Sequence, residues 1–329
     1  MSVISTPAQP ESTAQRPSGV VVDDRRVTVD GITAQYLEAG TGPTVLLLHG
    51  HEHSASSWRW VIPALARTHR VLALSLPGHG NTAQARAYTP GSDTTPFVAE
   101  FLHTLGVGPL HVVGHSAGGA LAVRLALTDP ARIQTLVLVD SAGLGREVHP
   151  LLAVDTLPLV GELAILLSRL PGGNLGRTMM STAMLFARPW RAPADFLTEQ
   201  HDRGRRPGQL EASTAMARAL FDATGQRQIL LDQLPAITAP ALVVWGACDY
   251  VLPAHQAHTA VHLLPHGRLA LLPNCGHLPH VEHPERFAAM LSNWLTEHHA
   301  PSSNSSPGPL TLVDSSEGST TATTESSTV

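Results

Sequence analysis

The sequence predicts an α/β fold in which helices cover both faces of a mostly parallel sheet. Short runs rich in Val and Leu alternate with segments of helical periodicity, which is the order of repeated β-α-β units. The later runs are apolar without alternation, as expected for strands buried on both faces. Hydrophobic residues make up 43% of the 329 residues, which is enough for one large core.

Short apolar runs mark the predicted strands. The first two runs alternate in polarity and lie close together, so they predict an antiparallel hairpin, whereas the later runs predict parallel strands. The runs are Arg26–Val29, Ala34–Glu38, Val45–His49, Val71–Leu76, His111–Gly114, Leu136–Asp140, Ala241–Gly246 and Arg268–Leu272.

Helix start and stop signals fall between these runs. Thr94–Pro96 predicts a helix start, because Pro fits the first turn of a helix, and Gly106 predicts the end of that helix. A second helix is predicted over Ala117–Thr128, where an Asp-Pro pair follows. Pro284 opens a last helix, whose apolar stripe is Phe287, Met290, Leu291, Trp294 and Leu295.

The charge pattern argues against nucleic acid as a main partner. Charged residues make up 14%, the net charge is −5, and all 21 cations are Arg, without a basic stripe. Two cysteines cannot form a disulfide scaffold. Cys248 and Cys275 follow neighbouring predicted strands, so one disulfide between them stays open, while two buried thiols are favoured.

Hydropathy predicts a cytoplasmic protein without stable membrane insertion. Residues 1–19 lack the apolar segment of a signal peptide. The longest apolar stretch, Leu157–Leu167, is interrupted by Gly161 and Glu162 and is shorter than the roughly 18–20 residues that span a bilayer. The sequence does not determine the oligomeric state.

The domain organisation follows from shifts in composition. Residues 1–22 predict a flexible arm, and the Ser/Thr-rich residues 300–329 predict a disordered tail. The α/β core is expected over residues 23–141 and 238–299. Residues 142–237 hold amphipathic runs and no convincing strand, so they predict an all-helical insertion. Its Leu and Met residues are expected to pack the helices against one another, and part of the insertion is expected to cover an apolar pocket.

The segment Gly114–Gly118 carries the strongest chemical signal. Its sequence Gly-His-Ser-Ala-Gly directly follows a predicted strand and directly precedes a predicted helix, which is the context of a nucleophile elbow. Such a turn needs small neighbours and lifts the hydroxyl of Ser116 above the sheet edge, over the amino end of the helix. The glycine motifs of nucleotide-binding loops are absent from the sequence. Ser116 is therefore the candidate nucleophile.

A serine nucleophile needs a base, which is usually a histidine oriented by a carboxylate. His277 follows the last predicted strand, where its loop can reach back over the sheet edge. Asp249 follows the preceding strand and leaves the same edge. Asp140 also follows a strand and is the rival acid, but the order Ser116, Asp249, His277 favours Asp249.

Two backbone N–H groups are expected to bind the oxyanion of the reaction. One belongs to Ala117, the residue after the nucleophile. The other is assigned to His51, because this residue lies in the loop after an early strand and Gly50 permits a close turn there.

Five segments make the chain resemble the α/β-hydrolases that combine one catalytic domain with a helical lid. They lie within residues 25–299 and are Leu46–Gly50, Leu76–Gly80, Gly114–Gly118, Trp245–Asp249 and Gly276–Phe287. The resemblance implies the α/β-hydrolase fold: a mostly parallel eight-stranded sheet flanked by helices, the triad named above, and an all-helical lid inserted after the sixth strand.

The resulting prediction is an esterase-like serine hydrolase. It would cleave a carboxylic ester or related acyl bond of an apolar small molecule through an acyl-enzyme, without a cofactor. Ser116 stands where relatives that open epoxides or remove halide carry Asp. Carbon–carbon bond hydrolysis of ring-fission products, perhydrolysis and acyl transfer stay open on the same triad, although His115 and Leu278 replace the Asn and the aromatic residue frequent in carbon–carbon hydrolases. The intact triad disfavours a non-catalytic binding module.

Two groups of histidines have spacings that metal sites use, yet no metal is predicted. The first group belongs to the oxyanion loop, the second includes the candidate base, and neither has the Cys partners or the helical HExxH motif typical of zinc. The groups are His49, His51 and His53, and His277, His280 and His283.

Overall fold

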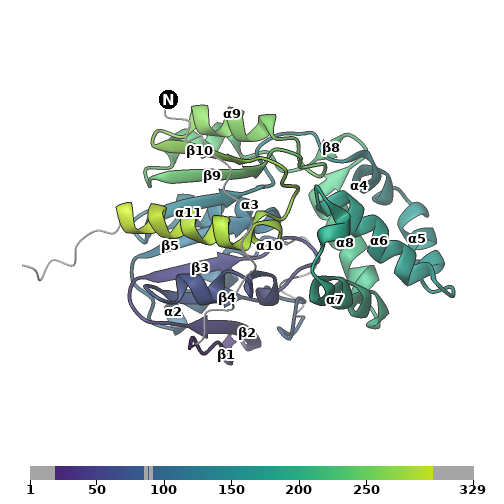
Figure 1. Ribbon diagram of the computed structural model, residues 1–329, viewed down its shortest axis with the longest axis horizontal. Helices are drawn as coiled ribbons and strands as arrows, with labels where there is room; N and C mark the ends of the chain where they lie inside the picture. Colours follow the sequence, from purple (N-terminus) through teal and green to yellow (C-terminus); the bar gives the residue numbers. More distant parts are fainter. Residues whose placement is uncertain (1–18, 85–87, 89–91, 299–329) are drawn as a thin grey trace, which may run out of the picture. The chain divides into compact units, whose positions relative to one another are not determined.

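A sheet of eight strands forms the centre of the computed structural model, which describes residues 19–84, 88 and 92–298 (Figure 1). The strand order is β1-β2-β4-β3-β5-β6-β9-β10; β2 is antiparallel to β1 and β4, and all other pairs are parallel. The predicted class and the mostly parallel sheet are therefore confirmed. The strands are β1 (Asp23–Val29), β2 (Ile32–Ala39), β3 (Thr44–Leu48), β4 (Arg70–Leu74), β5 (Leu110–His115), β6 (Ile133–Val139), β9 (Ala241–Gly246) and β10 (Gly267–Leu272).

The predicted hairpin is the pair β1–β2. Asp30 and Gly31 connect its strands with φ values of 48° and 75°. Both angles lie in the left-handed region that a two-residue hairpin turn requires. The turn places Val29 opposite Ile32, and both of these side chains are buried in the core. The hairpin thus closes one edge of the sheet.

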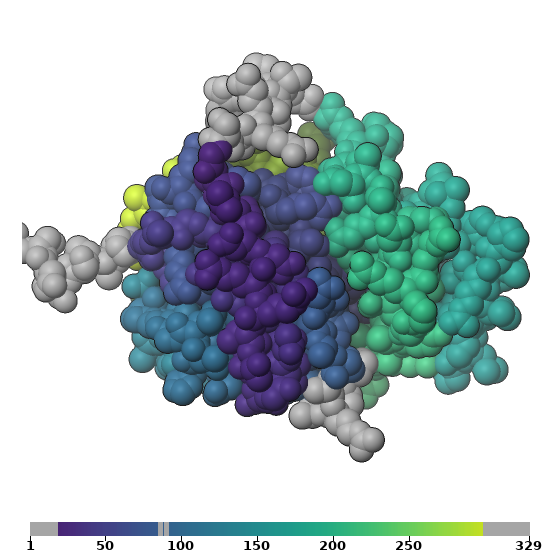
Figure 2. Space-filling view, turned by 90° about the horizontal axis from the view of Figure 1, so that it is seen from below, coloured from purple at the N-terminus to yellow at the C-terminus, as the bar shows by residue number. Residues whose placement is uncertain are grey.

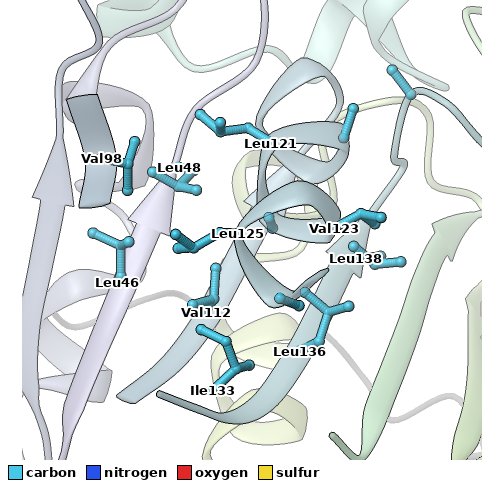
Figure 3. Packing of buried hydrophobic residues seen from close by; sticks show 14 of the residues in the cluster. Leu46, Leu48, Val98, Val112, Leu121, Val123, Leu125, Ile133, Leu136 and Leu138 are labelled. Atoms are coloured by element: carbon cyan, nitrogen blue, oxygen red, sulfur yellow. The ribbon is translucent and has the colours of Figure 1, made fainter. Parts of the chain in front are cut away.

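Helices cover both faces of the sheet, because alternate residues of each strand point to opposite sides. Leu46 and Leu48 pack with α2 and α3 on one face, while Val45 and Leu47 pack with α1 and α11 on the other. Figure 3 shows Leu121 and Leu125 of α3 beside strand residues of the first face. The helices of the core are η1 (Ala55–Trp58), α1 (Ile62–Leu65), α2 (Thr95–Thr104), α3 (Ala117–Thr128), α9 (His255–Leu263), α10 (Pro279–Glu282) and α11 (Pro284–Glu297).

Residues 142–237 form a mostly helical insertion between β6 and β9. Figure 1 shows its helices gathered at one end of the sheet, and Figure 2 shows the same teal and green segment beside the purple and blue core. Its elements are α4 (Pro150–Asp155), α5 (Val160–Ser168), α6 (Gly173–Leu185), η2 (Pro189–Arg191), α7 (Ala194–Arg205), α8 (Gln209–Leu220), β7 (Phe221–Asp222), β8 (Gly225–Gln226) and η3 (Leu231–Ala236).

The prediction of an all-helical insertion is wrong in one place. β7 and β8 pair as a small antiparallel ladder. The carboxylate of Asp222 accepts a hydrogen bond of 2.8 Å from the N–H of Thr224, which turns the chain between the two strands. Strands of two residues are too short to produce the alternation by which a strand is recognised in a sequence.

Two further predictions concern the ends of the chain and the membrane. The predicted tail and residues 1–18 of the predicted arm lie outside the described residues. Within the described part of the chain, no helix combines the length and the apolar character needed to cross a bilayer.

Replacing Leu136 by Ala is expected to lower the free energy of unfolding by about 2–5 kcal/mol, because truncating a fully buried leucine leaves a cavity. Leu163→Ala is the matched control, since Leu163 is 53% exposed and its loss should change stability by less than about 0.5 kcal/mol. Urea denaturation followed by circular dichroism measures both. Equal losses in the two variants would contradict the placement of Leu136 in the core.

Candidate active site

Ser116 lies on a sharp turn between β5 and α3. Its φ of 51° and ψ of −118° are outside the regions that residues other than glycine usually adopt. The carbonyl oxygen of Ser116 accepts hydrogen bonds from the N–H groups of Gly119 at 2.9 Å and Ala142 at 3.0 Å. These bonds hold the strained turn, and strain of this kind is often stored at reactive residues.

Three glycines around Ser116 are required because other atoms approach them closely. A Cβ on Gly114 would lie 2.2 Å from the carbonyl oxygen of Gly118, and a Cβ on Gly118 would lie 2.4 Å from that of Leu48. A Cβ on Gly119 would lie 2.2 Å from the hydroxyl of Ser141. The amino end of α3 therefore packs directly against the carboxyl ends of the neighbouring strands.

His277 and Asp249 are joined directly. The Nδ1 of His277 lies 2.8 Å from a carboxylate oxygen of Asp249, and these side chains are 3% and 0% exposed. The other carboxylate oxygen accepts hydrogen bonds from the N–H groups of Val251 at 2.7 Å and Leu252 at 3.0 Å. The fixed carboxylate makes Nδ1 the protonated nitrogen of His277, so Nε2 is the nitrogen that remains for proton transfer.

Asp140, the rival acid of the sequence analysis, lies beside this pair. Its carboxyl group is fully buried and accepts a hydrogen bond of 2.9 Å from the N–H of Gly246. Burial, and then the charge of Asp249, raise the pKa of Asp140 well above its usual range. Burial thus disfavours the charged form of Asp140, whereas Asp249 is the group hydrogen-bonded to His277.

His49 holds the loop that carries His51, one of the two expected oxyanion donors. Its Nε2 accepts a hydrogen bond of 3.0 Å from the N–H of Leu76, so its Nδ1 donates to the carbonyl oxygen of Gly50 at 2.8 Å. Burial lowers the pKa of His49 well below its usual value, which keeps the ring neutral. A Cβ on Gly50 would lie 3.0 Å from the Cβ of Ser116. The loop that continues into His51 thus packs against the serine.

Ser116, His277 and His51 line one cavity of about 310 Å³. The helical insertion supplies most of the remaining wall. The sequence predicted that part of the insertion covers an apolar pocket, but not which of its side chains line it. Apolar side chains that face the cavity include Leu152, Val154, Val160, Ile165, Met180 and Met184. The cavity therefore offers a largely apolar environment beside the serine.

Polar groups gather at another part of the same cavity. The ring of His51 donates from Nε2 to the carbonyl oxygen of Ser213 in α8 at 3.0 Å, and the Ser213 hydroxyl donates to Glu52. Burial alone would raise the pKa of Glu52, but His51 and the Ser213 hydroxyl outweigh it and lower that pKa. Arg177 and Gln200 also line the cavity. The side chain of His51 thus links the oxyanion loop to the insertion.

Three further buried histidines, His53, His115 and His280, lie around His277. The sequence did not predict that these rings come together. His115 donates from Nε2 to the carbonyl oxygen of His277 at 2.8 Å, and its ring centre lies 4.8 Å from that of His280 and 6.0 Å from that of His53. Burial lowers the pKa of all three rings, that of His280 to about 3. The candidate base is thus surrounded by neutral rings.

A carboxylate ties the loop of His277 to the helical insertion. Glu282 in α10 accepts hydrogen bonds from the N–H groups of Gly276 at 2.7 Å and Ala187 at 3.0 Å, while the N–H of His277 donates to the carbonyl oxygen of Leu185 at 2.8 Å. Burial outweighs these N–H bonds and raises the pKa of Glu282 to about 7. Only the folded chain brings these four backbone segments together.

The cysteines are unpaired. Cys248 and Cys275 are both free thiols, so the disulfide interpretation is wrong. Cys275 is buried as predicted, whereas Cys248 is only partly buried. Burial raises the pKa of Cys275, which keeps it protonated and unreactive.

The two histidine groups of the sequence have separate bonding partners. His49 and His51 bond to different backbone segments, as described above, and His283 bonds to the carbonyl oxygen of Asn274 at 3.1 Å. Within residues 19–84, 88 and 92–298, one set of His, Cys, Asp and Glu side chains converges closely enough for a metal, namely Asp140, Asp249 and His277. The raised pKa of Asp140 and the N–H of His277 that points at Asp249 do not suit a cation.

Glu282→Gln is expected to change how stability depends on pH. Because burial raises this carboxyl pKa from its ordinary 4.5 to about 7, the folded state binds the proton more tightly than the unfolded state does. The resulting stability is fully present below the ordinary pKa and is lost as the pH rises through 7. The free energy of unfolding of the wild type should therefore fall relative to that of E282Q between about pH 5 and 8. Urea titrations measure it; a constant difference would contradict the assignment.

Comparisons with known proteins agree with the fold. A profile of the alpha/beta hydrolase family matches residues 45–290. A dihydrolipoyllysine-residue acetyltransferase component of the acetoin cleaving system from Pseudomonas putida is 31% identical, over 83% of this chain and 70% of that protein. A 2-hydroxy-6-oxo-6-(2'-aminophenyl)hexa-2,4-dienoic acid hydrolase from Metapseudomonas resinovorans is 28% identical, over 83% of this chain and 91% of that protein. The crystal structure of a membrane phospholipase A, described as a bacterial virulence factor, superposes with a TM-score of 0.71. Its sequence is 26% identical, and the match covers 84% of this chain and 86% of that chain. The chain belongs to the alpha/beta hydrolase family.

Proposed function

We propose that the protein is a serine hydrolase that cleaves a carboxylic ester of an apolar small molecule through an acyl-enzyme. The observation that carries the proposal is the hydrogen bond of 2.8 Å between His277 and Asp249, at the cavity that Ser116 also lines. A nucleophile, a base and an orienting carboxylate in this relation are the parts that acyl transfer to serine needs. Membership of a hydrolase family supports the general class.

In the proposed reaction, the hydroxyl oxygen of Ser116 attacks the ester carbonyl carbon while its proton passes to Nε2 of His277. The carboxylate of Asp249 stabilises the imidazolium that forms. When the tetrahedral intermediate collapses, His277 gives the proton to the leaving alcohol and Ser116 stays acylated. Water then attacks the acyl group with His277 as base, the acid is released, and the serine is restored.

The N–H groups of His51 and Ala117 are the proposed oxyanion donors. Ala117 is the first residue of α3, and the first N–H groups of a helix have no partner within it. The hydrogen bonds of His49 fix the loop before His51. A donor of this kind typically lowers the barrier by about 3–4 kcal/mol.

The helical insertion is the proposed lid and selects the substrate. Its apolar side chains, among them Val160, Ile165 and Met184, favour apolar acyl or alcohol groups because such groups gain by leaving water. The cavity of about 310 Å³ lies at the lower end of the range for ligand pockets, which suits a small molecule.

One observation favours a second candidate, the hydrolysis of a carbon–carbon bond in a ring-fission acid. Arg177 lines the same cavity, and its guanidinium would pair with the carboxylate of such a substrate. The relative from Metapseudomonas resinovorans is named for a dienoic acid. Acyl transfer and perhydrolysis would use the same acyl-enzyme, but the acyl group would pass to an acceptor other than water.

Ser116→Ala is expected to abolish labelling by a fluorophosphonate probe and to lower kcat/KM for an ester by more than about 10³-fold, because the covalent intermediate cannot form. Gel fluorescence and ester hydrolysis measure the two effects. Ser292→Ala, on the far helix α11, is the matched control and should label like the wild type. Undiminished labelling of S116A would remove Ser116 from its proposed role.

A series of p-nitrophenyl esters is expected to show kcat/KM rising about fourfold for each added methylene until the cavity is filled, because each buried methylene contributes about 0.8 kcal/mol. Steady-state kinetics over the series, with a 2-hydroxy-6-oxo-dienoic acid measured in parallel, tests this. Turnover of the dienoic acid without turnover of any ester would favour the second candidate over the first.

A further inference from the structure

The outer helices of the insertion reverse the usual arrangement of a helix that faces water. In α5 the buried residues are Gly161 and Ser168, while Leu163, Leu166 and Leu167 are each more than half exposed. A helix at a protein–water boundary normally buries its leucines and exposes its small and polar residues. The outer face of α5 therefore has the composition of a buried surface.

Helix α6 repeats the pattern. Its buried residues are Thr178 and Thr182, while Leu175, Met179 and Met180 are 54–64% exposed. Figure 1 shows α5 at the outer side of the insertion, away from the sheet, with α6 beside it. The exposed leucines and methionines of these two helices, namely Leu163, Leu166, Leu167, Leu175 and Met179, are called the outer apolar face below.

This face is continuous with the wall of the cavity. Met180 lies next to Met179 in α6, is 62% exposed and also lines the cavity of Ser116. Leu151 and Val154 of α4 are likewise both exposed and part of the cavity wall. An apolar molecule held at the outer face would thus meet apolar side chains on its way to the serine.

Cations lie at the edge of the same face. A hollow of about 720 Å³ is lined by Leu170 and Leu175 together with Arg169, Arg205 and Arg206. Arg169 is paired with Glu211. Arg205 and Arg206 are exposed and, among the residues that the structure describes, have no carboxylate within ion-pair distance.

We propose that the outer apolar face docks on the surface of an anionic phospholipid bilayer, with Arg205 and Arg206 at the lipid phosphates. A helix with one apolar face can lie in the plane of the interface, its apolar side chains reaching the acyl chains, without spanning the membrane. Cations near such a surface strengthen binding to anionic lipid. A second copy of this chain would bring the same unpaired cations, so it is a poorer partner for this edge.

Sedimentation with lipid vesicles tests the proposal. The full chain should bind vesicles that contain phosphatidylglycerol more tightly than vesicles of phosphatidylcholine alone. Leu163→Asp/Leu166→Asp should weaken binding to both kinds of vesicle by at least about tenfold, because two leucines that would enter the bilayer are lost. Val21→Asp/Val22→Asp is the matched control, since these exposed valines lie outside the insertion and should leave binding unchanged. Thermal unfolding checks that both double variants fold.

The arginines are tested separately. Arg205→Ala/Arg206→Ala should weaken binding to phosphatidylglycerol vesicles by about tenfold and reduce its salt dependence, with little effect on phosphatidylcholine vesicles. Unchanged binding of this variant would overturn the role of the two arginines.

Three outcomes would overturn the docking itself. They are no binding of the wild type to anionic vesicles, equal binding of the leucine double variant, and a concentration-dependent dimer in light scattering that the leucine double variant abolishes. The last outcome would assign the face to a second copy of this chain. Ser116→Ala should bind vesicles like the wild type, so the docking and the proposed hydrolase activity can fail independently.

Discussion

The candidate site depends on a backbone contact that only glycine allows. Gly118 places the start of α3 against the carbonyl oxygen of Leu48, where a Cβ would lie 2.4 Å away. This contact brings the end of β3, the turn at Ser116 and the amino end of α3 to one point. The φ of 51° at Ser116 persists because the packed surroundings leave the turn no room to relax. The proposed oxyanion donors owe their positions to the same contact.

Burial then decides which groups around this point carry charge. Asp140 and Asp249 both lie next to His277, yet burial raises the pKa of Asp140, while Asp249 accepts hydrogen bonds from two backbone N–H groups. The rings of His115 and His280 are neutral because burial makes it costly to charge them, and neighbouring histidines add to that cost. The carboxyl group of Asp249 thus faces the candidate base at hydrogen-bond distance, an arrangement that stabilises an imidazolium when it forms.

The insertion has two apolar sides, and they have different consequences. Its inner side completes the cavity beside Ser116, where Ile165 and Met184 replace water with hydrocarbon. Its outer side exposes leucines such as Leu166, whose contact with water is unfavourable in the isolated chain. Glu282 and Leu185 join the insertion to the loop of His277, so a movement of these helices would also reach the candidate base.

Most of the fold and much of the site follow from local sequence signals. Apolar runs predicted all eight strands of the sheet, and the small residues around Ser116 predicted the turn that carries it, because both depend on neighbours in the chain. Three features needed the tertiary structure: the hydrogen bond between Glu282 and Ala187, the raised pKa of Asp140, and the leucines of α5 on the outside. Each depends on which distant segments surround a side chain, and periodicity shows only that a helix has an apolar face, not which neighbour that face meets.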